Sequence, residues 1–250
     1  MTIIRLGVLF LLLNHIHVLV NCQASVPGRI NQIMDDRKEF ILSLHDSIKG
    51  TDRILVNGEL YYPHQQGALN HPFFRNESWL TGSVTIEDQL YEDCLLRYDL
   101  FLDQLLYLHI ADGANTLALN REMVDSFVLE GSEFVYFHAH QLNSTRNMEE
   151  GYYETVFDGS TGLYARRTKR RLRNDGFRRD EFQQDTKLYL YKDSIFMFFR
   201  NDRQLRKALG DYEKEIRQFM REKNIHVKID PPSKVSLVIA YYQELKRRGK

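Results

Sequence analysis

Residues 80–119 have the sequence LTGSVTIEDQLYEDCLLRYDLFLDQLLYLHIADGANTLAL. Branched aliphatic and aromatic side chains recur in it in short segments, which is typical of strands. The connections between these segments are too short to hold a helix, so neighbouring strands are expected to run antiparallel. The strands expected in this part of the chain are 80–86, 90–98, 104–110 and 115–119.

The same pattern extends outward in both directions. Before it, Asn57–Gly58 stands between two apolar triplets, which favours a hairpin with a type I′ turn. After it, apolar segments alternate with turn residues as far as residue 199. We therefore expect a large curved antiparallel sheet, a meander over residues 51–200. Its further strands are expected at 126–129, 133–138, 152–157, 163–168, 187–191 and 194–199.

Helical periodicity flanks the expected sheet. Between Pro27 and Gly50, apolar residues recur at spacings of three and four, which predicts an N-terminal helix within residues 25–50. Residues 201–250 repeat this pattern, and Ser233 is a suitable N-cap for the last helix. The predicted fold class is α+β, a single domain over residues 25–250 that ends in two or three helices. Those helices are expected at 202–209, 211–223 and 233–245.

The first 24 residues predict a signal peptide. Arg5 precedes an apolar segment, and small or polar residues follow it up to Ala24. We expect cleavage after Ala24 and export to the periplasm or cell surface. The apolar segment is about 15 residues long, short of the roughly 20 that span a bilayer, so no transmembrane span is expected in the mature form. The alternative is lipidation at Cys22, which would tether the protein by acyl chains.

Composition narrows the class of protein further. Cleavage would leave Cys94 as the only cysteine, so no intramolecular disulfide can form, and we expect Cys94 to pack as a small hydrophobe. Secreted animal domains of this size usually carry cystines, so their absence favours a bacterial envelope protein. The mature chain would carry 33 basic and 34 acidic residues, which gives no general attraction to nucleic acid.

His138 and His140 form the most suggestive chemical pattern. On a strand, residues two apart point to the same side, so the two imidazoles could occupy two positions of a zinc or copper site. A third ligand would have to come from elsewhere in the chain. The alternative is two histidines at a solvated strand end. The candidates for a third ligand are His64, His71, His109 and Glu133.

Residues 166–179 are strongly basic. One interpretation is a charged edge strand and its loop, which protects a sheet from pairing with other chains. The other is a patch for an anionic envelope partner such as a lipid headgroup or an acidic glycan. The candidate patch residues are Arg166, Arg167, Lys169, Arg170 and Arg171.

No motif in the chain indicates catalysis. Arg97, Asp99 and Asp103 stand close together, but a structural salt bridge explains them better than acid–base chemistry. Gly159–Ser160–Thr161–Gly162 lacks the pattern of a nucleophile elbow. There is no phosphate-binding loop, dinucleotide fingerprint or zinc-protease motif. We therefore expect no catalytic residues and no cofactor.

Several short motifs give the chain a resemblance to known proteins. It resembles a broad group of uncharacterised exported proteins of Bacteroidetes-type bacteria. The resemblance implies a place in the cell envelope and no activity or site residues. The motifs that carry it include Gly82–Ser83–Val84, the segment Leu95–Leu96–Arg97–Tyr98–Asp99, Gly151–Tyr152–Tyr153–Glu154 and Leu209–Gly210–Asp211.

These observations together predict a non-enzymatic envelope protein that binds a partner, or an apolar or anionic ligand. The 14 Tyr and 15 Phe residues are expected mostly in the core, and a minority could line a cavity. A structural component of a surface assembly is an alternative. A metal-dependent hydrolase that uses His138 and His140 is a further one.

Overall fold

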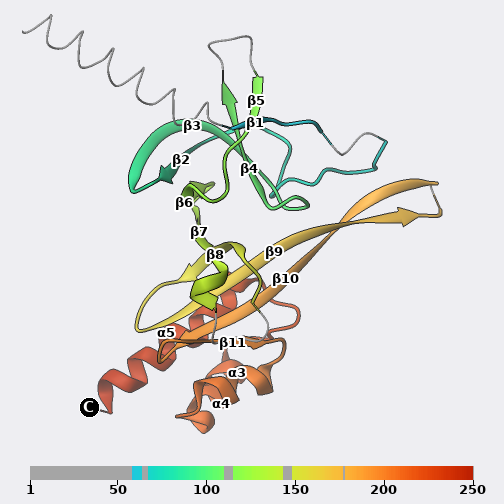
Figure 1. The fold of residues 1–250 in the computed structure, drawn as a ribbon. Coiled ribbons are helices and arrows are strands. Elements are labelled where there is room, and N and C mark those ends of the chain that lie inside the picture. Colours follow the sequence, from blue (N-terminus) through green and yellow to red (C-terminus); the bar gives the residue numbers. More distant parts are fainter. Residues whose placement is uncertain (1–57, 64–66, 110–114, 143–147, 177, 250) are drawn as a thin grey trace, which may run out of the picture. The chain divides into compact units, whose positions relative to one another are not determined.

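The computed structural model describes residues 58–63, 67–109, 115–142, 148–176 and 178–249 (Figure 1). All of them belong to the second of the two units into which the chain divides, Ile54–Lys250. The predicted signal peptide with Cys22 and the predicted helix within residues 25–50 lie outside the described residues, as does His64.

The described strands form one antiparallel sheet of eleven strands, in the order β1-β5-β4-β3-β2-β6-β7-β8-β9-β10-β11. The predicted meander is therefore confirmed, with two departures: β1 lies beside β5 instead of β2, and after β5 the chain returns to place β6 beside β2. The strands are β1 Glu59–Leu60, β2 Leu80–Ile86, β3 Gln89–Asp99, β4 Gln104–His109, β5 Asn115–Ala118, β6 Val124–Leu129, β7 Ser132–Phe137, β8 Gly151–Phe157, β9 Thr161–Asn174, β10 Arg179–Lys192 and β11 Ile195–Phe199.

Two strands differ clearly from the sequence-based expectation. β9 and β10 have 14 residues each and pair along their whole length, whereas the sequence predicts only 163–168 and 187–191. The added residues are mainly charged or polar, so no apolar pattern marks them. The expected hairpin at Asn57–Gly58 has its first strand outside the described residues, and its second strand, β1, pairs with β5.

Three helices follow the sheet, as predicted: α3 Asp202–Leu209, α4 Glu213–Glu222 and α5 Pro232–Arg248. The side chain of Asn201 caps α3 by accepting a hydrogen bond of 2.9 Å from the backbone N–H of Gln204. The expected N-cap of α5 is wrong. Ser233 lies within the first turn, and Pro231 occupies the N-cap position without a side-chain hydrogen bond. Pro232 suits the first helical position because it has no N–H to satisfy.

The sheet curls tightly around its first core. Tyr98 on β3 and Tyr152 on β8 are four strands apart in the sheet order, which would be roughly 19 Å in a flat sheet. Their ring centroids are only 5.7 Å apart. Phe127 on β6 and Phe134 on β7 belong to the same buried cluster as the two tyrosines, and all four side chains are at most 1% exposed. The inner side of the curl is therefore filled with aromatic rings, where a carrier of apolar ligands would have an open cavity.

The helices build a second core against one face of β9, β10 and β11 (Figure 1). Leu163, Leu190 and Phe199 point to this face and are buried against apolar residues of all three helices. Because side chains alternate along a strand, the intervening residues point to the other face. No helix in the described part of the chain is long and apolar enough to cross a bilayer.

Candidate functional site

Arg166, the first residue of the predicted basic patch, is used inside the protein. Its side chain is 8% exposed and donates two hydrogen bonds of 2.8 Å to the carboxylate of Asp103. Burial alone would lower the pKa of Arg166, but the hydrogen bond and the charge of Asp103 raise it. A guanidinium enclosed in this way is not available to an external anion.

Arg167 and Lys169 also have partners within the chain. Arg167 donates to the carboxylate of Glu154 at 2.5 Å, and Glu154 is itself buried. The Lys169 ammonium donates to two backbone carbonyls in residues 71–73, at 2.9 and 2.8 Å. Burial lowers the pKa of Lys169, because the charged form is the one that loses water.

Only the outer part of the basic segment lies at the surface. Arg170 is exposed, and Arg171 contacts Asp180 across the β9–β10 pair at 2.7 Å. This part of β9 extends past the residues that pair with β8. The five predicted patch residues are therefore not assembled into one open surface.

The two histidines weighed as metal ligands lie side by side. β7 ends at Phe137, so His138 follows the strand, and His140 lies in a 3-10 helix, Ala139–Leu142. The alternation expected of a strand thus does not apply to them. Their rings stack with centroids 5.4 Å apart, and Nδ1 of His138 is 3.8 Å from Glu150. Among the residues that the structure describes, no three His, Cys, Asp or Glu side chains are grouped to hold a metal.

The carboxylates near Arg97 have structural roles. Asp99 accepts hydrogen bonds of 2.8 and 3.0 Å from two backbone N–H groups of the β3–β4 turn. Arg97 does not pair with either carboxylate, because its guanidinium lies over the rings of Phe73 and Trp79, 4.6 and 4.2 Å from their centroids. The expected salt bridge between Arg97 and these carboxylates is therefore wrong, and Asp103 forms its ion pair with Arg166, which is distant in the sequence.

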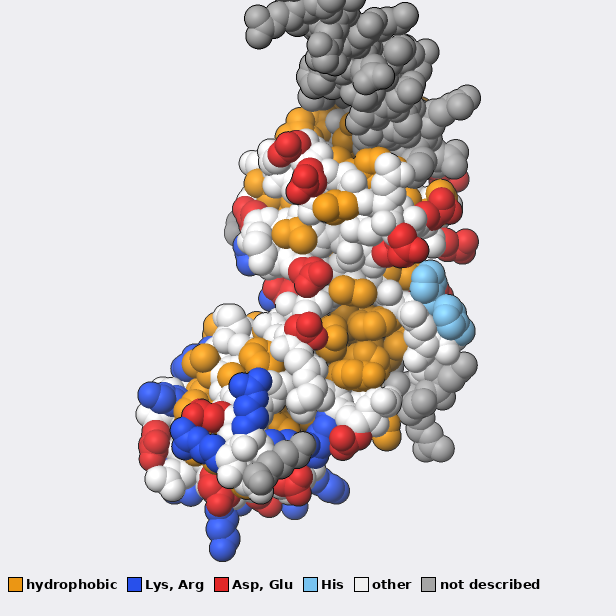
Figure 2. Space-filling view, turned by 90° about the vertical axis from the view of Figure 1, so that its left-hand side faces the viewer, with side chains coloured by type: hydrophobic (Ala, Val, Ile, Leu, Met, Phe, Trp, Pro, Cys, Tyr) orange, Lys and Arg blue, Asp and Glu red, His pale blue; other side chains and the backbone are white. Residues whose placement is uncertain are grey.

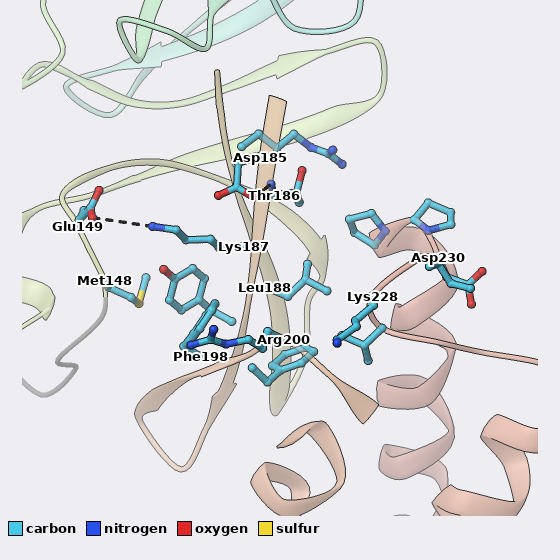
Figure 3. A pocket seen from close by; sticks show the side chains of 17 residues that line it. Met148, Glu149, Asp185, Thr186, Lys187, Leu188, Phe198, Arg200, Lys228 and Asp230 are labelled. Carbon is cyan, nitrogen blue, oxygen red and sulfur yellow. Dashed lines mark hydrogen bonds and ion pairs between the residues drawn. The ribbon is translucent and has the colours of Figure 1, made fainter. Parts of the chain in front are cut away.

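A pocket of about 970 Å³ lies where β11 ends and β10 continues without it (Figure 3). Phe199, the last residue of β11, pairs with Leu188 of β10. Residues 185–187 of β10 form one wall, and residues 227–232, which lead into α5, form the opposite wall. The volume is typical of ligand pockets, which range from about 300 to 1,000 Å³.

The pocket combines apolar surface with two free cations. Leu188, Tyr189 and Phe198 provide its apolar lining. Arg200 and Lys228 also line it and are exposed, and neither has a carboxylate partner among the residues that the structure describes. The guanidinium of Arg200 lies 5.5 Å from the centre of the Phe198 ring. Both cations can therefore meet an anion brought from outside.

All three acidic groups of the pocket have partners within the chain, and the carboxylate of Asp185 accepts a hydrogen bond of 3.0 Å from the backbone N–H of Thr186. Glu149 lies 3.9 Å from the Lys187 ammonium. Asp230 accepts hydrogen bonds from the backbone N–H of His226 at 2.6 Å and from the Lys234 ammonium at 3.0 Å. The backbone hydrogen bond, and after it the bond from Lys234, lower the pKa of Asp230. Asp230 therefore remains an anion that is already bound by groups of its own chain.

An exposed apolar residue stands beside the free cations. Ile229 is 79% exposed and lines both this pocket and a second one of about 730 Å³. Arg203 of α3 and Lys228 are among the residues of the second pocket. On the face that Figure 2 shows, most of the Lys and Arg side chains lie in the lower part, together with several Asp and Glu side chains.

The sequence gives little indication of this site. Arg200 and Lys228 are far apart in the chain and belong to no motif. Pro231–Pro232 marks the start of α5, and it could have indicated a rigid segment before that helix. These residues come together because β11 is shorter than β10 and ends part of the way along it. No local sequence pattern reveals this arrangement.

No protein-family model matches this chain, and neither a curated protein nor a solved structure matches it.

Proposed function

We propose that this chain is an exported, non-enzymatic protein of the bacterial envelope that binds an acidic partner at the pocket beside β10. The observation that carries the proposal is the pair Arg200 and Lys228, two cations without a carboxylate partner in the described part of the chain, on a pocket lined by both polar and apolar side chains. Cations at a pocket attract and orient an anionic ligand, while the apolar lining supplies the contact area.

The surroundings favour a macromolecular partner over a small molecule. Ile229 lies at the boundary of two pockets and exposes most of its side chain to solvent. Covering such a residue with a partner stabilises the complex by about 25 cal/mol per Å² of apolar surface buried. A small ligand held inside the first pocket would leave most of Ile229 exposed.

The predicted leader supports the proposed location. Mass spectrometry of the protein purified from its own cells should find a mature chain that begins at Ser25. A chain that begins at a lipid-modified Cys22 would keep the envelope location and replace release by membrane attachment. Recovery of the chain with Met1 intact from the soluble interior of the cell would contradict export.

Binding can be tested with a defined probe. We expect isothermal titration of the protein with an acetylated hexapeptide that repeats valine–glutamate–glutamate to show saturable binding, and the same peptide with lysine for glutamate to show none. In the variant R200E/K228E the affinity should fall about tenfold or more.

The matched control is R170E/R247E, which makes the same change in charge at two exposed arginines outside the pocket. This variant should retain the affinity of the original protein. Equal affinities of the two variants, or no binding of the acidic peptide, would contradict the proposal.

A further inference from the structure

The outer edge of β10 is used as a pairing edge on both sides of the pocket. On one side, β11 pairs with residues 188–192. On the other, the side-chain amide of Asn70 accepts from the N–H of Phe182 at 2.6 Å and donates to its carbonyl at 2.9 Å. Leu69 donates its N–H to the carbonyl of Asp180 at 2.8 Å. Even-numbered residues of β10 thus direct their backbone polar groups away from β9.

Between these two pairings lies an open interval. Gln184 and Thr186 are the even-numbered residues in it, and no described strand pairs with them on this edge. The N–H of Thr186 is taken by the adjacent Asp185 side chain at 3.0 Å. The interval from Phe182 to Leu188 is roughly 20 Å long at 3.3 Å per residue, enough for four or five residues of an added strand.

The pocket lies against this interval, since residues 185–188 line it. We infer that the acidic partner is an extended polypeptide segment that enters the pocket as a strand and pairs with β10 at Gln184 and at the carbonyl of Thr186. This inference rests on the proposed function and adds to it the chemical class of the partner. Addition of a strand to an exposed sheet edge is a common way to bind a peptide, because the backbone supplies affinity and pockets for alternate side chains supply specificity.

The charges fit an acidic strand with carboxylates on both of its faces. Figure 3 shows Lys228 on one side of β10 and, on the other, Lys187, whose ammonium lies 3.9 Å from the exposed Glu149. Arg200 follows Phe199, which faces the helices, and its guanidinium lies near the Phe198 ring on the opposite face. Since side chains alternate along a strand, a segment with acidic residues at neighbouring positions presents one to each side.

Backbone methylation of the peptide tests the pairing directly. In the hexapeptide, N-methyl groups at every second residue remove the N–H groups of one strand edge only. We expect one of the two methylation registers to reduce the affinity about tenfold or more and the other to be tolerated. The tolerated register is the matched control for the effect of methylation on peptide conformation.

The remaining outcomes separate this inference from the proposed function. If the acidic peptide binds with dependence on Arg200 and Lys228 but both registers are tolerated, strand pairing is wrong and the binding function stands. If polyacrylate of equal carboxylate number displaces the peptide with equal affinity, a backbone is not recognised and the inference is also overturned. If the protein alone sediments as a dimer that R200E/K228E dissociates, the occupant of this edge is a second copy and the inference fails. Absence of any peptide binding removes the proposed function itself.

Discussion

The guanidinium of Arg166 on β9 and the carboxylate of Asp103, in the turn just before β4, are joined by two hydrogen bonds of 2.8 Å, although β9 and β4 are six strand positions apart in the sheet order. In a flat sheet that separation would be roughly 29 Å. The hydroxyl of Tyr98 donates to the same carboxylate at 2.5 Å, and the backbone N–H of Lys169 donates to the carbonyl of Leu100 at 3.0 Å. These contacts hold the two ends of the curl together.

Replacing Arg166 should therefore destabilise the fold strongly. In Arg166→Leu the buried carboxylate of Asp103 loses its cation, which costs about 3–5 kcal/mol in comparable cases. Urea denaturation followed by circular dichroism measures this as a lower free energy of unfolding. Arg170→Leu, a change at an exposed position of the same strand, should cost less than about 0.5 kcal/mol. Similar transition midpoints for the two variants would show that the ion pair does not hold the curl.

Gly151 should tolerate no side chain. Its φ is +138°, and a Cβ there would collide with the carboxylate of Asp103 and the guanidinium of Arg166. We expect Gly151→Ala to lower the free energy of unfolding by more than about 3 kcal/mol, from strain and collision together. Gly131→Ala is the matched control, because its φ is +72° with no atom within 4 Å, and it should cost about 1–2 kcal/mol. Equal losses would mean that backbone strain alone explains Gly151.

Cys94 should be unreactive in the folded protein. Its side chain is buried, and burial, followed by the charge of Asp93, raises its pKa to about 11. The thiolate is the reactive form, and almost none is present near pH 8. Iodoacetamide should therefore leave the tryptic peptide with Cys94 unmodified in the native protein and alkylate it in concentrated guanidinium chloride. Rapid alkylation of the native protein would contradict the burial of Cys94.

The stability of the fold should decrease below neutral pH, in part because of His71. Burial, and then the charge of Lys169, lowers the pKa of His71 below 6.5, and its Nδ1 is buried without a hydrogen-bond partner. At a pH between the lowered pKa of His71 in the folded protein and its ordinary pKa in the unfolded chain, the unfolded chain binds more protons than the folded protein. The contribution of neutral His71 to the stability is thus complete above pH 6.5 and is lost as the pH falls toward the pKa in the folded state.

The measurement compares urea midpoints at about pH 7.5 and about pH 5. His71→Leu should show a smaller difference between the two than the original protein. His140→Leu, a change at an exposed position, serves as the control and should keep the original difference. An unchanged difference in His71→Leu would assign the pH dependence to other groups.

Local pattern was sufficient for most elements of the fold. The expected segments 80–86 and 202–209 coincide with β2 and α3, because each buries a regular set of apolar residues. The outer halves of β9 and β10 carry charged residues on both faces and were missed for that reason. Their length comes from pairing with each other and from contacts with residues 67–73.

The candidate site could not be predicted from local sequence patterns, for a different reason. The basic cluster at 166–171 drew attention as a possible surface, yet Arg166 finds its partner 63 residues away in Asp103. Conversely, Arg200 and Lys228 are single cations in the sequence and meet at one pocket only through the tertiary fold. Sequence shows which residues carry charge, whereas the availability of a charge depends on distant partners.

The most direct test of the proposed binding edge is amide hydrogen exchange at Gln184, measured by NMR with and without the acidic hexapeptide. The N–H of this residue points to the open interval of β10, so a paired strand should slow its exchange, while the amide of Gln183, which faces β9, should change little. Exchange at Gln184 that is unaffected by saturating peptide would contradict the account.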